Sequence, residues 1–168
     1  MGGRRRFPHH LYMAALERAV LDTPVGPLTV AVEDGVLREI RFLNGAVGLA
    51  GRPLHVSQTL DRLRAYFDGD IAALDPIPAE PSGTPFQLRV WSMLRRIPAG
   101  RTWTYSELAH AIGRPDAVRA VGAANGANPI PIVIPCHRVI GADGRLVGYG
   151  GGLERKRWLL THEGCRLL

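Results

Sequence analysis

Cysteine is scarce in this chain of 168 residues, which contains only Cys136 and Cys165. Two cysteines cannot form the disulfide framework of a small secreted domain, so we expect a reducing, cytoplasmic location. Long hydrophobic runs are missing too, because no segment approaches the roughly 20 apolar residues of a membrane-spanning helix. We therefore expect neither a disulfide-rich secreted protein nor a membrane partner.

The first part of the chain also lacks the features of a targeting signal or a metal site. Residues 1–10 contain three arginines, but no apolar stretch of signal-peptide length follows them. We interpret residues 1–12 as a disordered basic leader, with Met1 and Met13 as alternative starts. No cysteine precedes Cys136, and His9, His10 and His55 alone form a poor zinc-binding set, so we predict no metal.

The net charge of +6 is unevenly distributed. Residues 1–81 carry −1 (9 Arg, 10 Asp and Glu), whereas residues 82–168 carry +7 (12 Lys and Arg, 5 Asp and Glu). A basic surface favours a polyanion partner such as nucleic acid. A solvated Arg-rich surface explains the same charge equally well, so charge alone leaves both interpretations open.

The N-terminal part has the pattern of a small sheet with one helix. Residues 28–32 and 36–42 are predicted strands, joined by the hairpin turn signal Asp34-Gly35. Apolar residues at helical spacing over residues 60–67 predict a helix that ends at Gly69. We interpret residues 43–57 as loop and the Pro-rich residues 75–82 as a linker. No chemistry is evident in residues 13–81, which we assign to an N-terminal α/β domain with its linker.

Residues 82–168 form the second predicted domain, which begins with a strongly signalled helix. Thr84 is a predicted N-cap, Pro85 takes the first helical position, and Gln87 completes a capping box. Apolar residues recur from Phe86 to Ile97 on one face, which is typical of a core helix. Pro98 and Gly100 are predicted to end it.

Two short helices follow in a pattern typical of a helix-turn-helix. Thr104 and Glu107 form a second capping box, Gly113 closes that helix, and Pro115 is predicted to begin the next one. After Arg119 the second helix becomes slim, because residues 122–126 are mainly Gly and Ala. Arg119 is either a solvated charge or a side chain that enters a nucleic-acid groove.

The segment Pro135-Cys136-His137-Arg138 carries the strongest chemical signal. The thiolate form of cysteine is the nucleophile, and adjacent cations lower the pKa of a thiol. A lone cysteine is more often a small buried hydrophobe, but His137 and Arg138 argue against an ordinary core strand. Farther along, a predicted helix over residues 153–162 ends at Glu163, where the helix dipole disfavours a carboxylate. A cationic or imidazole partner would resolve this misfit, and so would a frayed, solvated end.

Together these motifs resemble a known family. Pro135-Cys136-His137-Arg138-Val139 resembles the PCHRV signature of the O6-alkylguanine-DNA alkyltransferases, and the likeness extends over about residues 83–166. The other matching segments are Thr84-Pro85-Phe86-Gln87, Tyr105, Arg119-Ala120-Val121-Gly122, Asn128-Pro129, Tyr149, Gly151-Gly152-Leu153, Trp158-Leu159-Leu160 and His162-Glu163-Gly164. The ordered set is far more specific than any single motif.

The resemblance implies a role for each matching residue. Cys136 would accept the alkyl group, His137 would act as general base through a water, and Glu163 would orient His137. Asn128 would brace the active-site segment, and Tyr105 would contact the target phosphate and protonate the departing base. The implied DNA contacts are Arg119, Tyr105, Ala120, Gly122 and Arg138, and the backbone around Val139, Tyr149 and Gly150 would line the pocket.

The implied fold is α/β of the α+β type, with a small N-terminal sheet-and-helix domain before a mostly helical domain with a helix-turn-helix. The implied activity is stoichiometric, irreversible transfer of the alkyl group from O6-alkylguanine in double-stranded DNA to Cys136, by a monomer without cofactor. A non-catalytic sensor of alkylated DNA is the alternative, although such relatives carry tryptophan in place of the cysteine. A thiol hydrolase built on Cys136 and His137 is a third hypothesis. Gly150 departs from the family pattern, because this position is often serine in animal members. Trp103 has no assigned role.

Overall fold

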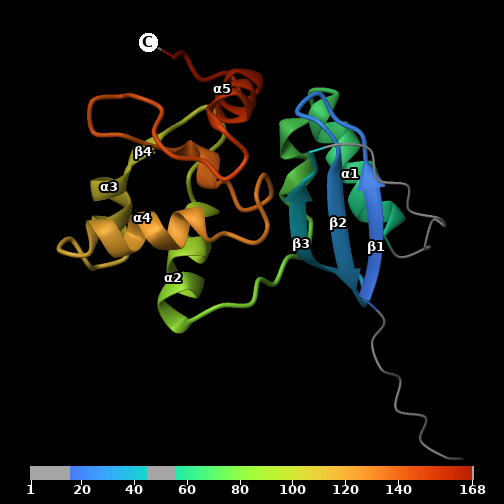
Figure 1. The fold of residues 1–168 in the computed structure, drawn as a ribbon, viewed down its shortest axis with the longest axis horizontal. Coiled ribbons are helices and arrows are strands. Elements are labelled where there is room, and N and C mark those ends of the chain that lie inside the picture. The colour runs from blue at the N-terminus through green and yellow to red at the C-terminus, as the bar shows by residue number, and fades with distance from the viewer. Residues whose placement is uncertain (1–15, 45–55, 168) are drawn as a thin grey trace, which may run out of the picture.

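The computed structural model describes residues 16–44 and 56–167. Its N-terminal part, residues 16–81, is an antiparallel sheet in the order β1-β2-β3 packed against helix α1. The elements are β1 (Leu16–Leu21), β2 (Leu28–Glu33), β3 (Val36–Phe42), α1 (Ser57–Phe67) and a 3-10 helix (Ile71–Leu74). Figure 1 shows the sheet with α1 beside it, next to the helices of the C-terminal part. The predicted basic leader and most of the predicted loop 43–57 lie outside the described residues.

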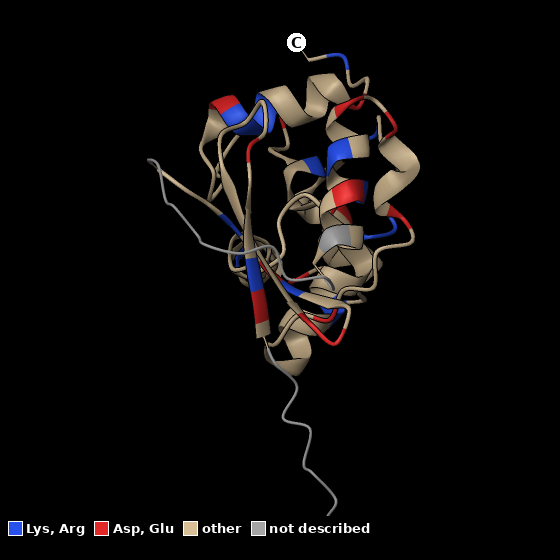
Figure 2. Ribbon diagram, turned by 90° about the vertical axis from the view of Figure 1, so that its right-hand side faces the viewer, with Lys and Arg blue, Asp and Glu red and all other residues tan. Residues whose placement is uncertain are grey.

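The predicted hairpin is confirmed. β2 and β3 pair antiparallel around Asp34 and Gly35, whose φ angles of 49° and 79° lie in the left-handed region that such a tight turn needs. β1 was not predicted. Its apolar alternation is weak, because Leu16 is exposed while Glu17 lies on the same face as the buried Ala19 and Leu21. Basic and acidic side chains pair along these strands, for example Arg38 Nε with Glu33 Oε2 at 3.0 Å. Figure 2 marks the basic and acidic positions along the ribbon.

The other edge of the sheet, β3, is covered by the chain that follows α1. Leu37 N–H donates to Pro78 O at 2.8 Å, and Glu80 N–H donates to Leu37 O at 3.0 Å. Ile40 N–H donates to Pro129 O of the C-terminal part at 3.0 Å. The predicted linker therefore lies against the sheet, and β3 is fixed to the segment that leads to Cys136.

The C-terminal part, residues 82–167, is mostly helical. Its elements are α2 (Pro85–Leu94), β4 (Trp103–Thr104), α3 (Tyr105–Ala111), α4 (Val118–Gly126), a 3-10 turn (Cys136–Arg138), β5 (Val139–Ile140) and α5 (Leu153–His162). Both predicted capping boxes are present, at Thr84 and Thr104. Two predicted boundaries are wrong: α2 ends at Leu94, a turn before Pro98, and α4 begins at Val118 rather than at Pro115.

Trp103, which the sequence left without a role, pairs with Val139. The two residues join β4 and β5 in a short parallel ladder. This ladder fixes the start of α3 beside the segment that follows Cys136. The packing thus brings the helix pair α3–α4 and the cysteine segment together.

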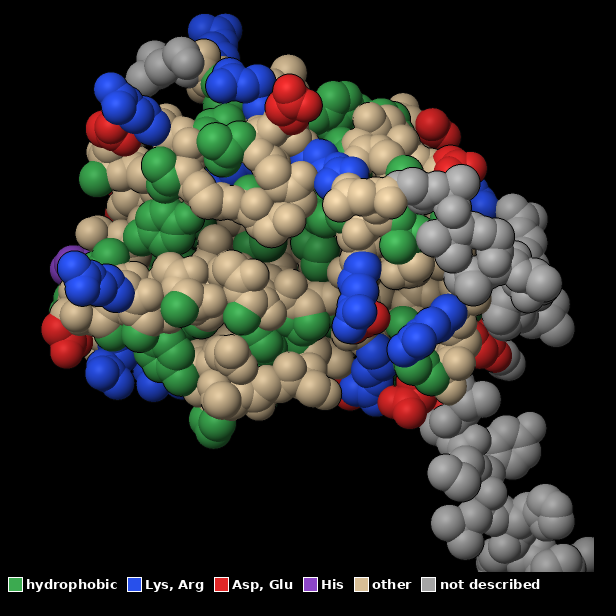
Figure 3. All heavy atoms as spheres, viewed as in Figure 1, with side chains coloured by type: hydrophobic (Ala, Val, Ile, Leu, Met, Phe, Trp, Pro, Cys, Tyr) green, Lys and Arg blue, Asp and Glu red, His purple; other side chains and the backbone are tan. Residues whose placement is uncertain are grey.

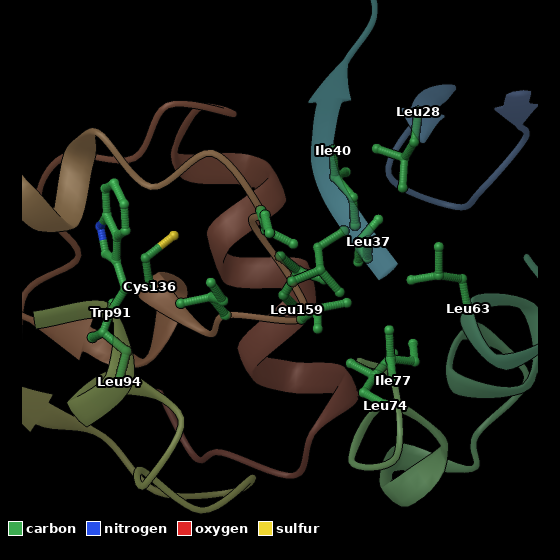
Figure 4. Close-up of a cluster of buried hydrophobic side chains, with 14 of the residues drawn as sticks. Leu28, Leu37, Ile40, Leu63, Leu74, Ile77, Trp91, Leu94, Cys136 and Leu159 are labelled. Atoms are coloured by element: carbon green, nitrogen blue, oxygen red, sulfur yellow. The ribbon is translucent and has the colours of Figure 1, made fainter. Parts of the chain in front are cut away.

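One hydrophobic core crosses the boundary between the two parts. It runs from Leu28 and Ile40 of the sheet to Trp91 and Leu94 of α2, and Figure 4 shows Leu159 of α5 between the two groups. Trp91 Nε1 donates to Ala124 O at 2.8 Å, which ties α2 to α4. Within the described ranges, no helix is long and apolar enough to cross a bilayer.

Candidate active site

Cys136 lies at a cavity of about 400 Å³ between the two parts of the chain. The walls come from residues 40–42 of β3, Tyr105 of α3, Gly122 and Asn125 of α4, and the loop 148–151. Cys136 itself is 5% exposed. The volume is in the range of natural small-molecule pockets, and it suffices for one flat heterocycle.

Two asparagines hold the cysteine segment against the end of α4. Asn128 Nδ2 donates to Ile134 O at 2.8 Å, and Asn128 Oδ1 accepts from Ile130 N–H at 3.0 Å. Asn125, which the sequence analysis missed, donates to Cys136 O at 3.4 Å. Asn128 is thus hydrogen-bonded to the segment that leads to Cys136, which is compatible with a bracing role.

Glu163 is the centre of a buried polar cluster behind Cys136. Its Oε1 lies 2.8 Å from His137 Nε2, and Arg138 binds both oxygens, with Nε 2.8 Å from Oε2 and Nη2 3.0 Å from Oε1. Tyr66 Oη of α1 donates to Oε1 at 2.8 Å. Glu163 at the helix C-terminus therefore has the imidazole and cationic partners that were considered for it, and the alternative of a frayed, solvated helix end is wrong.

The electrostatics of this cluster favour an ionised Glu163 and a neutral His137. Burial raises the pKa of Glu163, but the hydrogen bond from His137, followed by the hydrogen bonds and charge of Arg138, outweighs it and brings the pKa to about 2. Burial lowers the pKa of His137 despite Glu163. A neutral His137 that donates Nε2–H to Glu163 leaves Nδ1 as a proton acceptor. This atom is buried and has no partner among the described residues.

The expectation that adjacent cations lower the pKa of Cys136 is wrong. Burial raises it to about 11, although the Asn128 side chain and the charge of Lys156 act in the opposite direction. Arg138 contributes little to the thiol because its guanidinium is committed to Glu163. The resting thiol is therefore protonated near neutral pH, and a base is needed to form the thiolate.

Two residues with assigned roles lie in the interior of the structure. Arg138, assigned to DNA, is 9% exposed and donates to Glu163 and, through Nη1, to Ile97 O. Its guanidinium is thus part of the interior. Val139, whose surrounding backbone was expected to line the pocket, is fully buried, pairs with Trp103 and is not among the residues that line the cavity.

Tyr149 and Gly150 do line the cavity, as predicted. The Tyr149 ring meets Phe42 of β3 edge to face, with 5.9 Å between ring centroids. A Cβ atom at Gly151 would lie 2.8 Å from Phe42 and 2.9 Å from Tyr149, so this close approach requires glycine. At Gly150 a Cβ atom would meet nothing within 4 Å, which leaves the pocket open at this position.

Lys156 secures the loop that forms this wall. Its fully buried side chain donates through Nζ to Val147 O at 3.0 Å and to Gly148 O at 3.1 Å. Burial lowers its pKa to about 8. Tyr105 Oη of α3 also donates to Val147 O, at 3.2 Å.

Helix α4 presents the residues predicted to meet DNA. Arg119 and Ala120 are exposed, and Gly122 lines the cavity. A Cβ atom at Gly122 would lie 3.8 Å from the Tyr105 ring. Arg119 forms no ion pair within the described ranges, whereas Arg114 pairs with Asp116 at 3.6 Å. Figure 3 shows a mixed face of hydrophobic side chains and backbone, with basic side chains at its left end and near the sheet.

Sequence reasoning missed Tyr66, Asn125 and Lys156. Tyr66 fits the apolar spacing of α1, so its hydroxyl carried no separate signal. Asn125 lies within the slim stretch of α4. Lys156 is hidden among the charged residues at the start of α5, where exposure is the common case. For Lys156 a sequence signal did exist, because it is the chain's single lysine among 21 basic residues.

The fold and site define a class: an α+β protein with a helix pair beside a cavity, in which a buried cysteine has a His–Glu pair behind it. Residues 85–165 match the family model described as "6-O-methylguanine DNA methyltransferase, DNA binding domain". The chain is 48% identical over 151 residues to the methylated-DNA–protein-cysteine methyltransferase of Mycobacterium bovis, covering 87% of this chain and 91% of that protein. The chain belongs to the family of methylated-DNA–protein-cysteine methyltransferases, so the resemblance seen in the sequence is confirmed.

Two further comparisons place the chain within this family. It is 57% identical over 108 residues to the Shigella flexneri protein of the same name, a match that covers 64% of this chain and 63% of that relative. The chain thus matches less than two thirds of the length of this relative. The crystal structure of Mycobacterium tuberculosis OGT in complex with DNA shares the fold, with a TM-score of 0.75 at 47% identity, covering 86% and 90% of the two chains.

Proposed function

We propose that this chain repairs DNA by transferring the alkyl group of O6-alkylguanine to the sulfur of Cys136, once per molecule. The observation that carries the proposal is the position of Cys136 at a base-sized cavity beside α4, with the His137–Glu163 pair behind it. Family membership and the DNA complex of the mycobacterial relative support double-stranded DNA as the partner.

The target atom lies within the base stack of a duplex, so the nucleotide must rotate out of the helix into the pocket. Arg119 is placed on the exposed side of α4, where it can fill the space left by the base. Gly122 keeps α4 slim at the pocket mouth, which permits a close approach of the backbone. Tyr149 and Gly150 then line the pocket around the extruded guanine.

The chemical step is a displacement at the alkyl carbon. His137 Nδ1 accepts the Cys136 proton through a water, and Glu163 stabilises the imidazolium that forms. The sulfur–carbon bond forms as the carbon–O6 bond breaks, and the electron pair of that bond stays on the guanine. A proton from Tyr105 neutralises the departing base. Burial raises the pKa of Tyr105, so it stays protonated until that step.

The product is a thioether, which water does not cleave, so each molecule acts once and needs no cofactor. The finer parts of the proposal are a monomer, no metal, and a reducing cytoplasmic location that suits the free thiols Cys136 and Cys165. Repair of O4-alkylthymine at the same site is an additional activity to test. The competing proposal is a sensor that binds alkylated DNA without reacting.

Transfer from a duplex that carries radiolabelled O6-methylguanine tests the proposal. Cys136→Ala should abolish label uptake completely while retaining DNA binding, and the matched variant Cys165→Ala should transfer normally. Label on the Cys136→Ala protein would contradict the site assignment. Tight binding of the damaged duplex by the wild-type protein without any label uptake would favour the sensor. Multiple turnover of an ester or amide would instead favour a thiol hydrolase.

A further inference from the structure

Glu163 receives one hydrogen bond from outside the C-terminal part. Tyr66, on the last turn of α1, donates to Glu163 Oε1 at 2.8 Å across 97 positions of sequence. The same oxygen lies 2.8 Å from His137 Nε2. Tyr66 is fully buried, so its hydroxyl has no water to bond to instead. The hydroxyl and the imidazole therefore share one carboxylate oxygen.

Tyr66 is held firmly relative to α5. Its carbonyl oxygen lies 2.6 Å from His162 Nε2, which precedes Glu163 in the chain. The Tyr66 ring meets the rings of Phe67 and His162 edge to face, each with 5.1 Å between centroids. Because both the backbone and the ring of Tyr66 contact His162 of α5, the Tyr66 hydroxyl keeps a fixed position relative to Glu163.

We propose that Tyr66 is a positioning residue for alkyl transfer, which acts through Glu163 on the proton affinity of His137. The inference rests on the proposed function. A donor on Oε1 withdraws electron density from the carboxylate, so Glu163 holds a proton on His137 less strongly. His137 then stays neutral, and able to accept the Cys136 proton, down to a lower pH. The N-terminal part would thereby contribute to the reactivity of the nucleophile.

Tyr66 differs from Arg138, the other residue besides His137 that donates to Glu163, because it carries no charge. Arg138 binds both carboxylate oxygens and supplies the permanent positive charge. Burial, and then the charge of Glu163, raise the pKa of Tyr66, so it remains a neutral donor over the whole working range. The remaining titratable groups that face the cluster are Lys156 of α5, Cys165 after α5, Tyr149 of the pocket loop and Cys136 itself.

Removing only the hydroxyl isolates the effect. In Tyr66→Phe, Glu163 becomes more basic and the pKa of His137 rises. The midpoint of the rising limb of the pH–rate profile should therefore move upward by about one pH unit, the effect of one lost hydrogen bond. Phe67→Leu changes the neighbouring ring in the same aromatic cluster without touching Glu163, so it should leave the midpoint in place.

The profile is measured with two electrophiles. One is a duplex containing O6-methylguanine, and the other is iodoacetamide, which alkylates Cys136 without DNA and releases iodide. Peptide mass spectrometry counts the modification at Cys136 in each case. The same pair of variants is made in a Glu163→Gln background, where Tyr66→Phe should produce no additional shift.

The outcomes separate the two proposals. An unchanged midpoint in Tyr66→Phe, whatever the thermal stability of the variant, overturns the role of Tyr66. A shift that persists in the Glu163→Gln background overturns it as well, because Tyr66 would then act by another route. A wild-type protein that reacts with iodoacetamide but accepts no methyl group from DNA contradicts the proposed function. In that case the iodoacetamide profile still decides on Tyr66.

Discussion

The two parts of the molecule share one core but differ in what they bury. In the N-terminal part, Thr59 is the one buried polar residue of the described ranges apart from the Tyr66 hydroxyl. The C-terminal part buries Asn125, His137, Arg138, Lys156 and Glu163. Burying polar and charged groups is costly unless each is paired. The difference indicates that the reactive groups are concentrated in the C-terminal part, whereas the sheet supports the site and supplies one wall of the cavity.

The largest effect should follow from the loss of one charge in the C-terminal part. Glu163→Gln leaves the Arg138 guanidinium buried without its counter-charge, which should destabilise the fold by about 3–5 kcal/mol. The transfer rate should fall sharply as well, because His137 loses its anionic partner. Urea unfolding and single-turnover transfer measure the two effects. Glu154→Gln, in the exposed first turn of the same helix, should cost less than about 1 kcal/mol. Equal losses of unfolding free energy in Glu163→Gln and Glu154→Gln would contradict the difference between a buried and an exposed charge.

Acid should weaken the same cluster. The pKa of Glu163 is about 2 in the folded state, below its ordinary value, so its stabilisation is present above the unfolded pKa. That stabilisation should be lost as the pH falls from about 5 to 2, by up to about 3 kcal/mol. Urea unfolding free energies across this range measure the loss. The Glu163→Gln variant should show a flatter pH dependence, and an identical slope would contradict the assignment.

A smaller, selective effect is expected at the surface of α4. Arg119→Ala should weaken binding to the alkylated duplex by about 1–3 kcal/mol, because the space left by the extruded base is no longer filled. Its reaction with iodoacetamide should be normal, since Cys136 is unaffected. Fluorescence anisotropy measures the affinity. Arg64→Ala, which removes an exposed ion pair with Asp61 in the N-terminal part, is the control and should bind DNA normally. Equal losses would mean that total charge, rather than position, governs binding.

The smallest effect should come from the sheet. Gly35→Ala places a side chain at φ 79°, and although a Cβ atom would meet nothing within 4 Å, the strain should cost about 1 kcal/mol. The alkyl-transfer rate should be unchanged under conditions in which the variant is fully folded. Thermal unfolding and the transfer rate test this pair of statements. A slower transfer in a stable, folded variant would show that the sheet does more than support the site.

Much of the fold was predictable because its signals are local. The Asp34-Gly35 turn fixed the hairpin, and Thr84 and Thr104 marked two helix starts through side-chain bonds three residues away. β1 could not be found this way, because an edge strand alternates weakly. The start of α4 was predicted wrongly because Pro115 fits a turn as well as a first helical position.

The candidate site was only partly predictable, because burial is a property of the whole fold. The misfit of Glu163 at a helix C-terminus correctly indicated an imidazole or cationic partner, and the structure supplies both. No pattern could show that Arg138 turns inward rather than toward DNA. Nor could spacing along α1 show that the Tyr66 hydroxyl reaches Glu163. Contacts between distant segments decide the pKa of Cys136, and the sequence alone gave the wrong sign.

The most direct test of the account is to follow Cys136 by mass spectrometry after mixing the protein with duplex DNA containing O6-methylguanine. The tryptic peptide of residues 120–138 contains Cys136 and no other cysteine. We predict a gain of one methyl group on this peptide, at one per protein molecule, together with an equal amount of restored guanine in the DNA. An unmodified peptide from protein that binds the same DNA tightly would contradict alkyl transfer.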